Sequence, residues 1–313
     1  MIDQAEKLRR MVSDLGGAEG ADDAAADPSA GGGDASGLPK AARRAGTKLI
    51  TVTSGKGGVG KTNFTVNLAI ALGRMGYKVT IIDADFGLAN VDVLMGMTVK
   101  SSILETVSSG RDLMEALCEG PEGVMFLSGG SGVEEIAKLD PAKVGAFIEG
   151  MVRLDGISDV IIVDTGAGLS DTVMDFILAS DETVFVVTPE PTAITDAYAL
   201  MKMVVGRDRA HKLKILINRA ESEEEARSVT ERLTFVAGKF LSYAIESVGY
   251  IPYDENVVRA VKRQQPFTMA YPRSEASQKV AEIARTIMEL GAVNAERKGV
   301  RGFLRGLFGS AKA

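Results

Sequence analysis

The 313-residue sequence contains one cysteine, one histidine and no tryptophan. The single cysteine, Cys118, excludes a disulfide within the chain and a metal cluster held by several cysteines of one chain. It favours a reducing compartment such as the cytoplasm. The single histidine, His211, makes histidine-based catalytic triads and multi-histidine metal sites poor hypotheses, and we expect it at the surface just before a strand.

Long apolar runs are also missing. None approaches the ~18 residues of a membrane-spanning helix, and the first ten residues, MIDQAEKLRR, lack the apolar core of a signal peptide. Acidic residues are absent between Arg297 and Ala313, where five basic residues give a charge of +5. The net charge of −6 therefore leaves −11 on the rest of the chain. The acidic body disfavours binding to nucleic acid, whereas the basic end favours an anionic surface.

The chain divides into four segments by composition. Residues 1–15 have apolar residues at helical spacing, and residues 16–46 are rich in Gly, Ala and Asp, which predicts a disordered linker. Residues 47–291 alternate short apolar runs with helical stretches, and residues 292–313 form a basic amphipathic end. The third segment predicts a doubly wound α/β domain, with a mainly parallel sheet of about seven strands and helices on both faces. The seven runs are LITVTS, KVTIIDAD, GVMFLSG, DVIIVDTG, ETVFVVTP, LKILINR and AIESVGYIP.

A phosphate-binding loop follows the first of these runs. Gly55, Gly60, Lys61 and Thr62 fit the pattern G-x-x-x-x-G-K-[ST], whose glycines let backbone N–H groups surround phosphate oxygens. We expect Lys61 to neutralise the β and γ phosphates, Thr62 to bind Mg²⁺, and the following helix to direct its positive end at the same anion. The sequence is SGKGGVGKT, so a second lysine, Lys56, stands in a loop that needs only one.

The two-lysine loop resembles the deviant Walker A motif of the MinD/ParA family of nucleotide-switch ATPases. In that family the lysine that matches Lys56 crosses a dimer interface to the partner's nucleotide, where it adds a cation to the phosphates. The resemblance implies ATP, Mg²⁺ and an ATP-dependent homodimer, with catalytic roles for Lys56, Lys61 and Asp85. It implies nucleotide contacts along the loop from Gly55, Lys56, Gly57, Gly58, Val59, Gly60, Lys61, Thr62 and Asn63.

Acidic residues end two further apolar runs. Asp83 and Asp85 follow the second run and Asp164 follows the fourth, so a parallel sheet would bring them to the edge that carries the phosphate loop. Asp164 fits a Walker B aspartate that holds Mg²⁺ through water, and Asp85 could orient the attacking water. DADFGLANVD resembles the switch I segment of MinD-like proteins, which implies that Asp85 is catalytic and that Asp83 supports Mg²⁺. DTGAG, with Gly166 where MinD has proline, resembles the flagellar branch of the family.

Two loops at the same edge are candidates for base recognition, because in the family they flank adenine. ATP is therefore favoured, although LINRAE also resembles the guanine-recognising N-K-x-D motif with Glu221 in place of its aspartate, so GTP stays open. Glu190 matches a family segment near the dimer interface, and we assign it to the nucleotide site. The candidate base-site residues are Asn218, Arg219, Pro252, Tyr253 and Asp254.

The basic C-terminal segment has a continuous apolar face. A short basic amphipathic helix of this kind can lie in an anionic membrane surface, and the segment is similar to the membrane-targeting tail of MinD. Three glycines weaken it as an isolated helix by about 1 kcal/mol each, so we expect disorder in water and folding on lipid. Docking on the protein itself is the alternative. The predicted membrane-binding residues are Val300, Phe303, Leu304, Leu307 and Phe308.

The N-terminus favours one branch of the family. Its sequence DQAEKLR resembles the D-Q-A-x-x-L-R element of the FlhG (YlxH, FleN) branch, whose members control flagellar number and placement. In that branch the element stimulates the GTPase FlhF. The resemblance implies that residues 1–15 form a partner-activating helix, with contacts from Asp3, Gln4, Ala5, Leu8 and Arg9.

These resemblances predict a regulatory ATPase that dimerises on ATP and cycles between the cytoplasm and the inner face of the cell membrane. Its implied partners are an FlhF-like GTPase, flagellar switch-ring proteins and a transcription activator. No glutamine or glutamate follows Asp164 to position water, so we expect slow hydrolysis. A MinD-type division-site regulator is the alternative within the family. A DNA-binding ParA-type partition ATPase and a metabolic enzyme on the same fold are further alternatives.

Overall fold

The computed structural model describes residues 46–85, 91–99, 101–129, 135–136, 138–290 and 297–309. The predicted helix at residues 1–15 lies outside the described residues, as do residues 16–45 of the predicted linker and residues 86–90 of the switch I segment. Among the described residues, no helix is long and apolar enough to cross a membrane.

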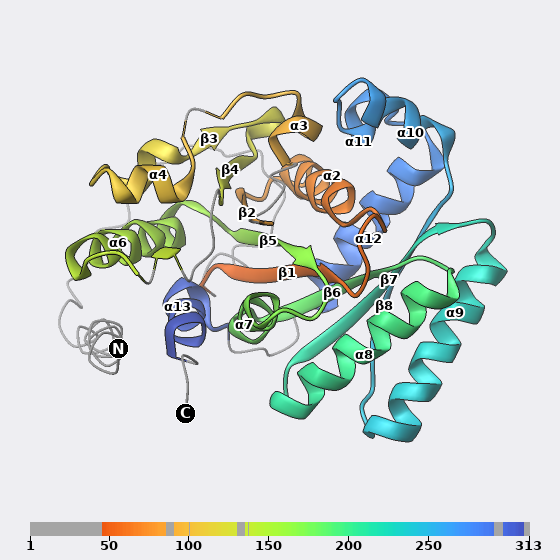
Figure 1. Ribbon diagram of the computed structural model, residues 1–313. Coiled ribbons are helices and arrows are strands. Elements are labelled where there is room, and N and C mark those ends of the chain that lie inside the picture. The colour runs from red at the N-terminus through yellow and green to blue at the C-terminus, as the bar shows by residue number, and fades with distance from the viewer. Residues whose placement is uncertain are drawn as a thin grey trace, which may run out of the picture.

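One eight-stranded sheet organises the fold, with the strand order β3-β4-β2-β5-β1-β6-β7-β8 (Figure 1). The seven predicted strands are all present and pair in parallel, which confirms the predicted sheet. The eighth strand, β3, pairs antiparallel with β4 at one edge, and its two residues are too few to give a sequence pattern. The strands are β1 (Lys48–Ser54), β2 (Val79–Ala84), β3 (Cys118–Glu119), β4 (Met125–Ser128), β5 (Val160–Ala167), β6 (Glu182–Val187), β7 (Lys212–Ala220) and β8 (Glu246–Pro252).

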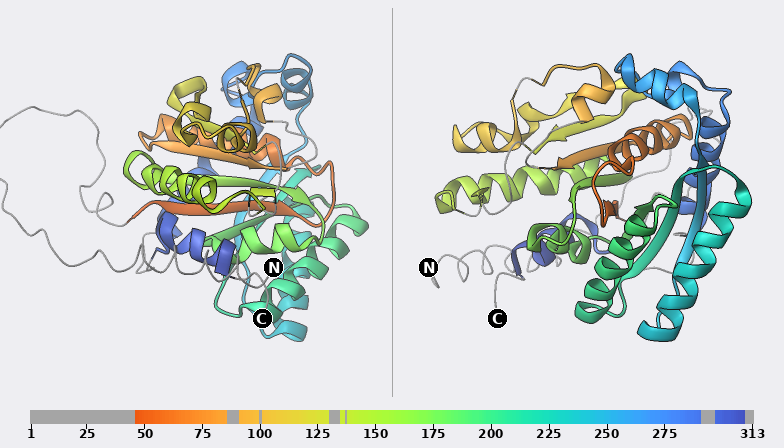
Figure 2. Two further views of the ribbon diagram at one scale, coloured as in Figure 1. Left: turned by 60° about the vertical axis from the view of Figure 1, so that its left-hand side comes forward. Right: turned by 45° about the vertical axis from the view of Figure 1, so that its right-hand side comes forward.

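Helices cover both faces of this sheet, as expected for a doubly wound fold (Figure 2). α2 and α12 pack on one face, and α6, α7, α8, α9 and α13 pack on the other. Short turns of other helical types lie at Leu113–Ala116, Pro121–Gly123 and Ala237–Leu241. The α-helices are α2 (Lys61–Arg74), α3 (Val91–Met95), α4 (Ile103–Ser108), α6 (Pro141–Ile157), α7 (Asp171–Ala179), α8 (Pro191–Arg207), α9 (Glu223–Val236), α10 (Glu255–Lys262), α11 (Phe267–Ala270), α12 (Glu275–Leu290) and α13 (Gly299–Gly309).

The strand order explains where a ligand can bind. β1 lies at the centre of the sheet between β5 and β6, and Ile50 pairs with residues of both neighbours. The chain runs from β1 through α2 to β2, on one side, and later crosses to β6 on the other. Ligands bind outside the carboxyl ends of parallel strands where the order reverses in this way. The phosphate loop follows β1 at this point.

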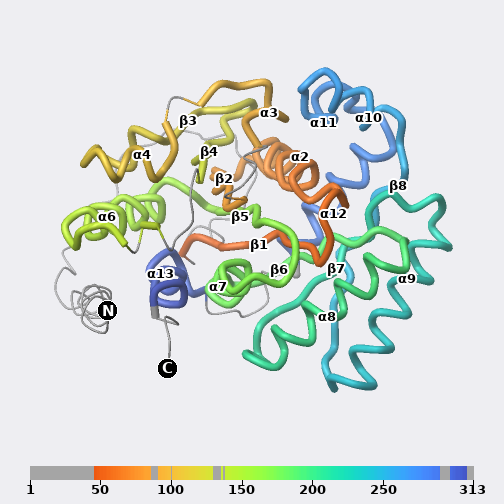
Figure 3. Tube along the Cα trace, in the orientation of Figure 1, coloured from red at the N-terminus to blue at the C-terminus, as the bar shows by residue number. Residues whose placement is uncertain are grey.

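The C-terminal helix α13 is packed on the domain, beside α6 and α7 (Figure 3). The ring of Phe303 stacks on Phe176, and the ring of Phe308 meets Phe147 edge to face, each pair with centroids 6.2 Å apart. The structure thus has the docked arrangement that the sequence left as the alternative, and the expected disorder of this segment in water is wrong. The buried residues are those predicted to bind membrane, Val300, Phe303, Leu304, Leu307 and Phe308.

A glycine allows this close docking. A Cβ atom at Gly306 would lie 2.8 Å from the Cα of Ala179 in α7, so a larger residue would force the two helices apart. The start of α13 is held by Lys298, whose Nζ donates to the carbonyls of Leu178 and Ser180 at 2.8 and 2.9 Å. Burial of a large apolar side chain contributes about 1.5–3 kcal/mol, which offsets the low helix propensity of the glycines. The packed α/β domain therefore does not end at residue 291, because residues 297–309 are part of it.

His211 is buried, which corrects the expectation of a surface position. Its Nε2 lies 2.8 Å from the hydroxyl of Thr183, and its Nδ1 has no hydrogen-bond partner. Burial is the main cause that lowers the pKa of His211 from 6.5 to about 4, with the positive charge of Lys298 as a second cause. The imidazole is therefore neutral at pH 7, because a charged ring would carry a second N–H with no acceptor.

This shift predicts a pH-dependent loss of stability. Between pH 6.5 and 4 the unfolded chain binds a proton at His211 that the folded chain does not, so stability falls as the pH falls through this window. The contribution present above pH 6.5 is up to about 3 kcal/mol, at 1.36 kcal/mol per pKa unit. Urea denaturation at pH 4 to 7 should show a smaller loss in His211→Gln than in the unchanged protein. Equal losses would contradict a buried neutral histidine.

Candidate functional site

The phosphate loop connects β1 to α2. Gly58 and Gly60 have φ angles of 77° and 94°, a backbone conformation that favours glycine, and α2 begins at the next residue. A Cβ at Gly55 would lie 2.3 Å from the backbone of Asp196 in α8, so this position also requires glycine. The predicted loop is therefore in place, with its glycines used for turns and for close approach.

Lys61 points into the site and Asp164 lies beneath it. The Nζ of Lys61 is 3.8 Å from Oδ1 of Asp164, and both side chains are buried. Asp164 also accepts a hydrogen bond from the hydroxyl of Thr65 at 3.0 Å, and the hydroxyl of Thr62 is close enough to lower the pKa of Asp164. Burial raises the pKa of Asp164 above its usual range, although Lys61 and the two hydroxyls act in the opposite direction. Sequence analysis missed Thr65, which lies one helical turn after Thr62.

These residues fit a magnesium ion held mainly by water and phosphate. Oδ2 of Asp164 is buried and has no hydrogen-bond partner, so it is available to a metal-bound water. Within the described ranges there is no cluster of three or more His, Cys, Asp or Glu residues that could hold a metal by itself. The predicted ligand set of the Thr62 hydroxyl, with Asp164 acting through water, suits an ion that keeps several waters.

The second strand brings two more aspartates to this edge. Asp83 in β2 is paired in register with Asp164 in β5. Its Oδ1 accepts from the backbone N–H of Asp85 at 3.1 Å, and its Oδ2 accepts from that of Val91 at 3.4 Å. Asp83 therefore holds the backbone at Asp85 and at Val91, near the two ends of the sequence DADFGLANVD. Asp85 is half-buried and close enough for its negative charge to raise the pKa of Asp164.

Lys56 contacts residues at the start of α8. Its Nζ donates to Oε2 of Glu190 at 2.7 Å and to the hydroxyl of Thr192 at 2.9 Å. The side chain of Lys56 is 39% exposed, whereas that of Lys61 is 8% exposed. The two lysines of the motif thus have different surroundings: Lys61 is buried against Asp164, and Lys56 is partly exposed beside Glu190 and Thr192. Glu190, assigned from the sequence to the nucleotide, contacts Lys56.

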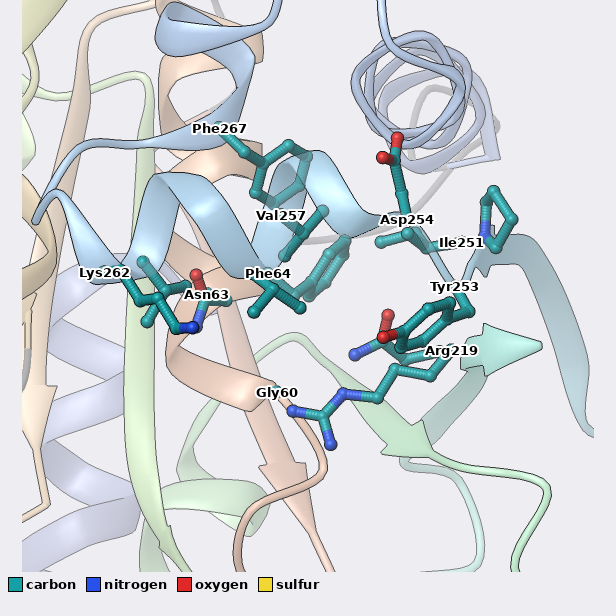
Figure 4. Close-up of a pocket in the computed structure, with 14 residues that line it drawn as sticks. Gly60, Asn63, Phe64, Arg219, Ile251, Tyr253, Asp254, Val257, Lys262 and Phe267 are labelled. Carbon is teal, nitrogen blue, oxygen red and sulfur yellow. The ribbon is translucent and has the colours of Figure 1, made fainter. Parts of the chain in front are cut away.

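A pocket of about 400 Å³ adjoins the phosphate loop between α2, α10 and the ends of β7 and β8 (Figure 4). Tyr253 and Arg219 lie on one side of it, and Phe64, Val257 and Phe267 gather on the other. Seven lining residues were predicted from the sequence: Gly60, Asn63, Asn218, Arg219, Pro252, Tyr253 and Asp254. Seven were not: Phe64, Ile251, Val257, Val258, Val261, Lys262 and Phe267.

Polar side chains around the pocket also fix its walls. Nδ2 of Asn218 donates to the carbonyl of Val59 at 2.7 Å, which ties the end of β7 to the phosphate loop. Asp254 caps α10 by accepting from the backbone N–H of Asn256 at 2.8 Å. Glu221, raised as a guanine contact, is not among the lining residues, and its backbone N–H donates to Glu225. An apolar pocket with few polar groups suits a planar base.

Comparison with known proteins gives consistent results. The family model of ParA, described as NUBPL iron-transfer P-loop NTPase, matches residues 46–288. The antiactivator FleN of Pseudomonas aeruginosa is 42% identical over 240 residues, which cover 77% of this chain and 86% of FleN. The flagellum site-determining protein YlxH of Helicobacter pylori is 36% identical over 266 residues, which cover 83% of this chain and 90% of YlxH.

A solved structure extends the likeness to the fold. The septum site-determining protein MinD of Pyrococcus horikoshii, complexed with Mg-ADP, superposes with a TM-score of 0.63 at 27% identity. The match covers 80% of this chain and 99% of that one. The resemblance that the two-lysine loop indicated is confirmed by the family model and by both flagellar relatives. This chain therefore belongs to the ParA family of P-loop NTPases, together with FleN, YlxH and MinD.

Proposed function

We propose that the chain is a Mg²⁺-dependent ATPase that acts as a switch and regulates flagellar number or placement. The ATPase activity follows from the family and from the phosphate loop with Lys61, Thr62 and Asp164. The flagellar function is supported by identities of 42% and 36% to FleN and YlxH, against 27% to the MinD structure. This difference favours the flagellar regulator over the division-site regulator.

The observation that carries the switch is that the two lysines have different partners and different exposure. Lys61 faces Asp164 inside the chain, where it can neutralise phosphates of a nucleotide bound to the same chain. Lys56 is partly exposed beside Glu190 and Thr192, and in the proposed dimer its side chain reaches the nucleotide of a facing subunit. ATP then joins two copies of the chain, and hydrolysis, with Asp85 placed near Asp164, separates them.

Membrane cycling is the second part of the proposal. The apolar face of α13 is buried against α6 and α7, so binding to an anionic membrane requires that α13 leave this position. α7 begins at Asp171, four residues after β5 ends at Ala167. A nucleotide-dependent change in the loop between them would therefore act directly on the surface that holds α13. The proposed sites of action are the cytoplasm and the inner face of the membrane.

Removal of Lys56 should separate nucleotide binding from dimerisation. Lys56→Ala leaves Lys61 and the loop glycines unchanged, so ATP binding should be retained, while the cross-subunit contact with phosphate is lost. Light scattering with ATP should then give a monomer where the unchanged protein gives a dimer. An ATP-dependent dimer of the variant would contradict the proposed function of Lys56.

Deletion of residues 1–15 should test the flagellar assignment. The truncated chain keeps all residues of the nucleotide site, so it should bind and hydrolyse ATP as the full chain does. If the N-terminal element activates an FlhF-like GTPase, the truncated chain should no longer stimulate GTP hydrolysis by that GTPase. Unchanged stimulation would remove the main support for a flagellar partner and favour the division-site alternative.

Displacement of α13 should expose its apolar face. Gly306→Val places a branched side chain against the backbone of Ala179, so α13 should detach. Sedimentation with anionic liposomes should then occur without ATP, because the face formed by Phe303 and its neighbours is free to bind lipid. The double variant with Phe303→Asp detaches α13 but lacks an apolar face, and it should stay in the supernatant. Sedimentation of that double variant would show that α13 is not the lipid-binding element.

A further inference from the structure

The ammonium group of Lys56 is held by two groups of its own chain. Oε2 of Glu190 is 2.7 Å from Nζ, and the hydroxyl of Thr192 is 2.9 Å from it. An ammonium group has three hydrogen-bond donors, so two of them are used within the chain. A phosphate of a facing subunit competes with these two acceptors for Nζ, so each hydrogen bond that Nζ gives up opposes that contact.

The holding groups are fixed relative to the loop by backbone packing. Glu190 is the residue before α8, and Pro191 occupies the first position of that helix, which restricts the backbone there. Gly55 lies so close to α8 that a Cβ atom would approach the backbone of Asp196 and Ala197 to 2.3–2.6 Å. On the loop side, the carbonyl of Lys56 accepts from the hydroxyl of Ser54 at 2.8 Å. The start of α8 and the loop therefore stay in contact, and the Lys56 side chain is the part that can swing.

Electrostatics also favours the held position in a single chain. The Lys56 side chain is the main cause that lowers the pKa of the Glu190 carboxyl, and the charge of Arg219 acts in the same direction. Glu190 stays ionised at pH 7 when Lys56 leaves, because the ordinary pKa of a glutamate carboxyl is well below 7, and Arg219 is a cation that remains near it. The released carboxylate would also add negative charge beside the phosphates at a dimer interface, which opposes dimer formation.

We propose that Glu190 and Thr192 are positioning residues that hold Lys56 within its own chain and so weaken the ATP-dependent dimer. This inference rests on the proposed function of Lys56 in that dimer. It gives Glu190 a different function from the nucleotide contact expected from the sequence. Each dimer requires the release of two lysines, so the effect of the holding pair counts twice. The pair thus sets the protein concentration at which ATP produces dimers.

Glu190→Gln should tighten the dimer. The ion pair is exposed, and such pairs change equilibria modestly, so we expect a dimer Kd lower by about fivefold with ATP. Thr192→Val should lower Kd by less, because it removes a neutral acceptor and leaves the carboxylate. Sedimentation equilibrium in ATP measures Kd for each variant. Glu231→Gln, which makes the same charge change on the exposed part of α9, is the matched control and should leave Kd unchanged.

A second measurement tests the holding pair in the nucleotide-free monomer. An N-hydroxysuccinimide ester reacts with free amines, and mass spectrometry of peptides measures its reaction at Lys56 alone. Replacement of the carboxylate by a neutral amide removes the ion pair, so Lys56 should react about threefold faster in Glu190→Gln than in the unchanged protein and in Glu231→Gln. Glu190→Asp, which keeps the charge, should react at a rate between the two.

The outcomes distinguish this inference from the proposed function. Faster labelling together with a tighter dimer supports the inference. Unchanged labelling overturns it, because Lys56 is then not held, and faster labelling with an unchanged or weaker dimer overturns it, because the pair then does not oppose dimerisation. If the unchanged protein forms no dimer with ATP, the proposed function fails and the inference fails with it. If that protein dimerises and Glu190→Gln matches it, only the inference fails.

Discussion

The buried carboxylate of Asp164 is the group on which the nucleotide site depends. It lies within β5, three residues before that strand ends at Ala167, and Lys61, Thr62 and Thr65 of α2 lie close to it. A buried charge is costly unless it is paired and hydrogen-bonded, so these contacts fix the first turns of α2 against the sheet. The phosphate loop is the segment between β1 and that helix, and its geometry follows from the same contacts.

The two lysines have separate functions, Lys61 in nucleotide binding and Lys56 in the proposed contact between subunits. Lys61 is committed to the interior by its ion pair with Asp164, so it serves nucleotide bound to its own chain. Lys56 is hydrogen-bonded to Glu190 and Thr192 at the surface. Its other partner, in the proposed dimer, is a phosphate bound to the facing subunit. In the dimer proposed above, a phosphate of the second subunit competes with Glu190 and Thr192 for Lys56, and nucleotide in that subunit would favour the released position of the side chain.

The C-terminal helix α13 is connected to the nucleotide site through α7. α13 packs on α7, and α7 follows directly from the loop after Asp164. Its first turn is held by Lys298 at the end of α7, and by a hydrogen bond from the backbone N–H of Lys298 to Asp181 at 2.6 Å. The nucleotide site and the proposed membrane-binding helix are therefore separated by one nine-residue helix and its flanking loops. In the proposed switch, the helix that binds membrane is therefore close to the site that binds nucleotide.

Local sequence patterns predicted the elements and the polar residues that follow them. The seven parallel strands, the loop glycines, Lys61, Asp164 and the base-site loops after β7 and β8 were all found in this way, because each depends on residues close together in the chain. The apolar wall of the base pocket was missed, since Val257 and Phe267 have the same spacing whether they face a ligand or a core. His211 was misplaced because a single residue before a strand carries no sign of its burial.

The sequence by itself determined the family and the nucleotide site, because phosphate binding requires particular residues at fixed spacing. Tertiary structure decided the partners of Lys56 and the position of α13. Glu190 is 134 residues from Lys56, and Phe176 is more than a hundred residues from Phe303, so neither contact leaves a trace in local spacing. An amphipathic helix has the same sequence pattern on lipid and on protein. Only the contacts of α13 with α7, Gly306 against Ala179 and Phe303 against Phe176, show which surface it occupies here.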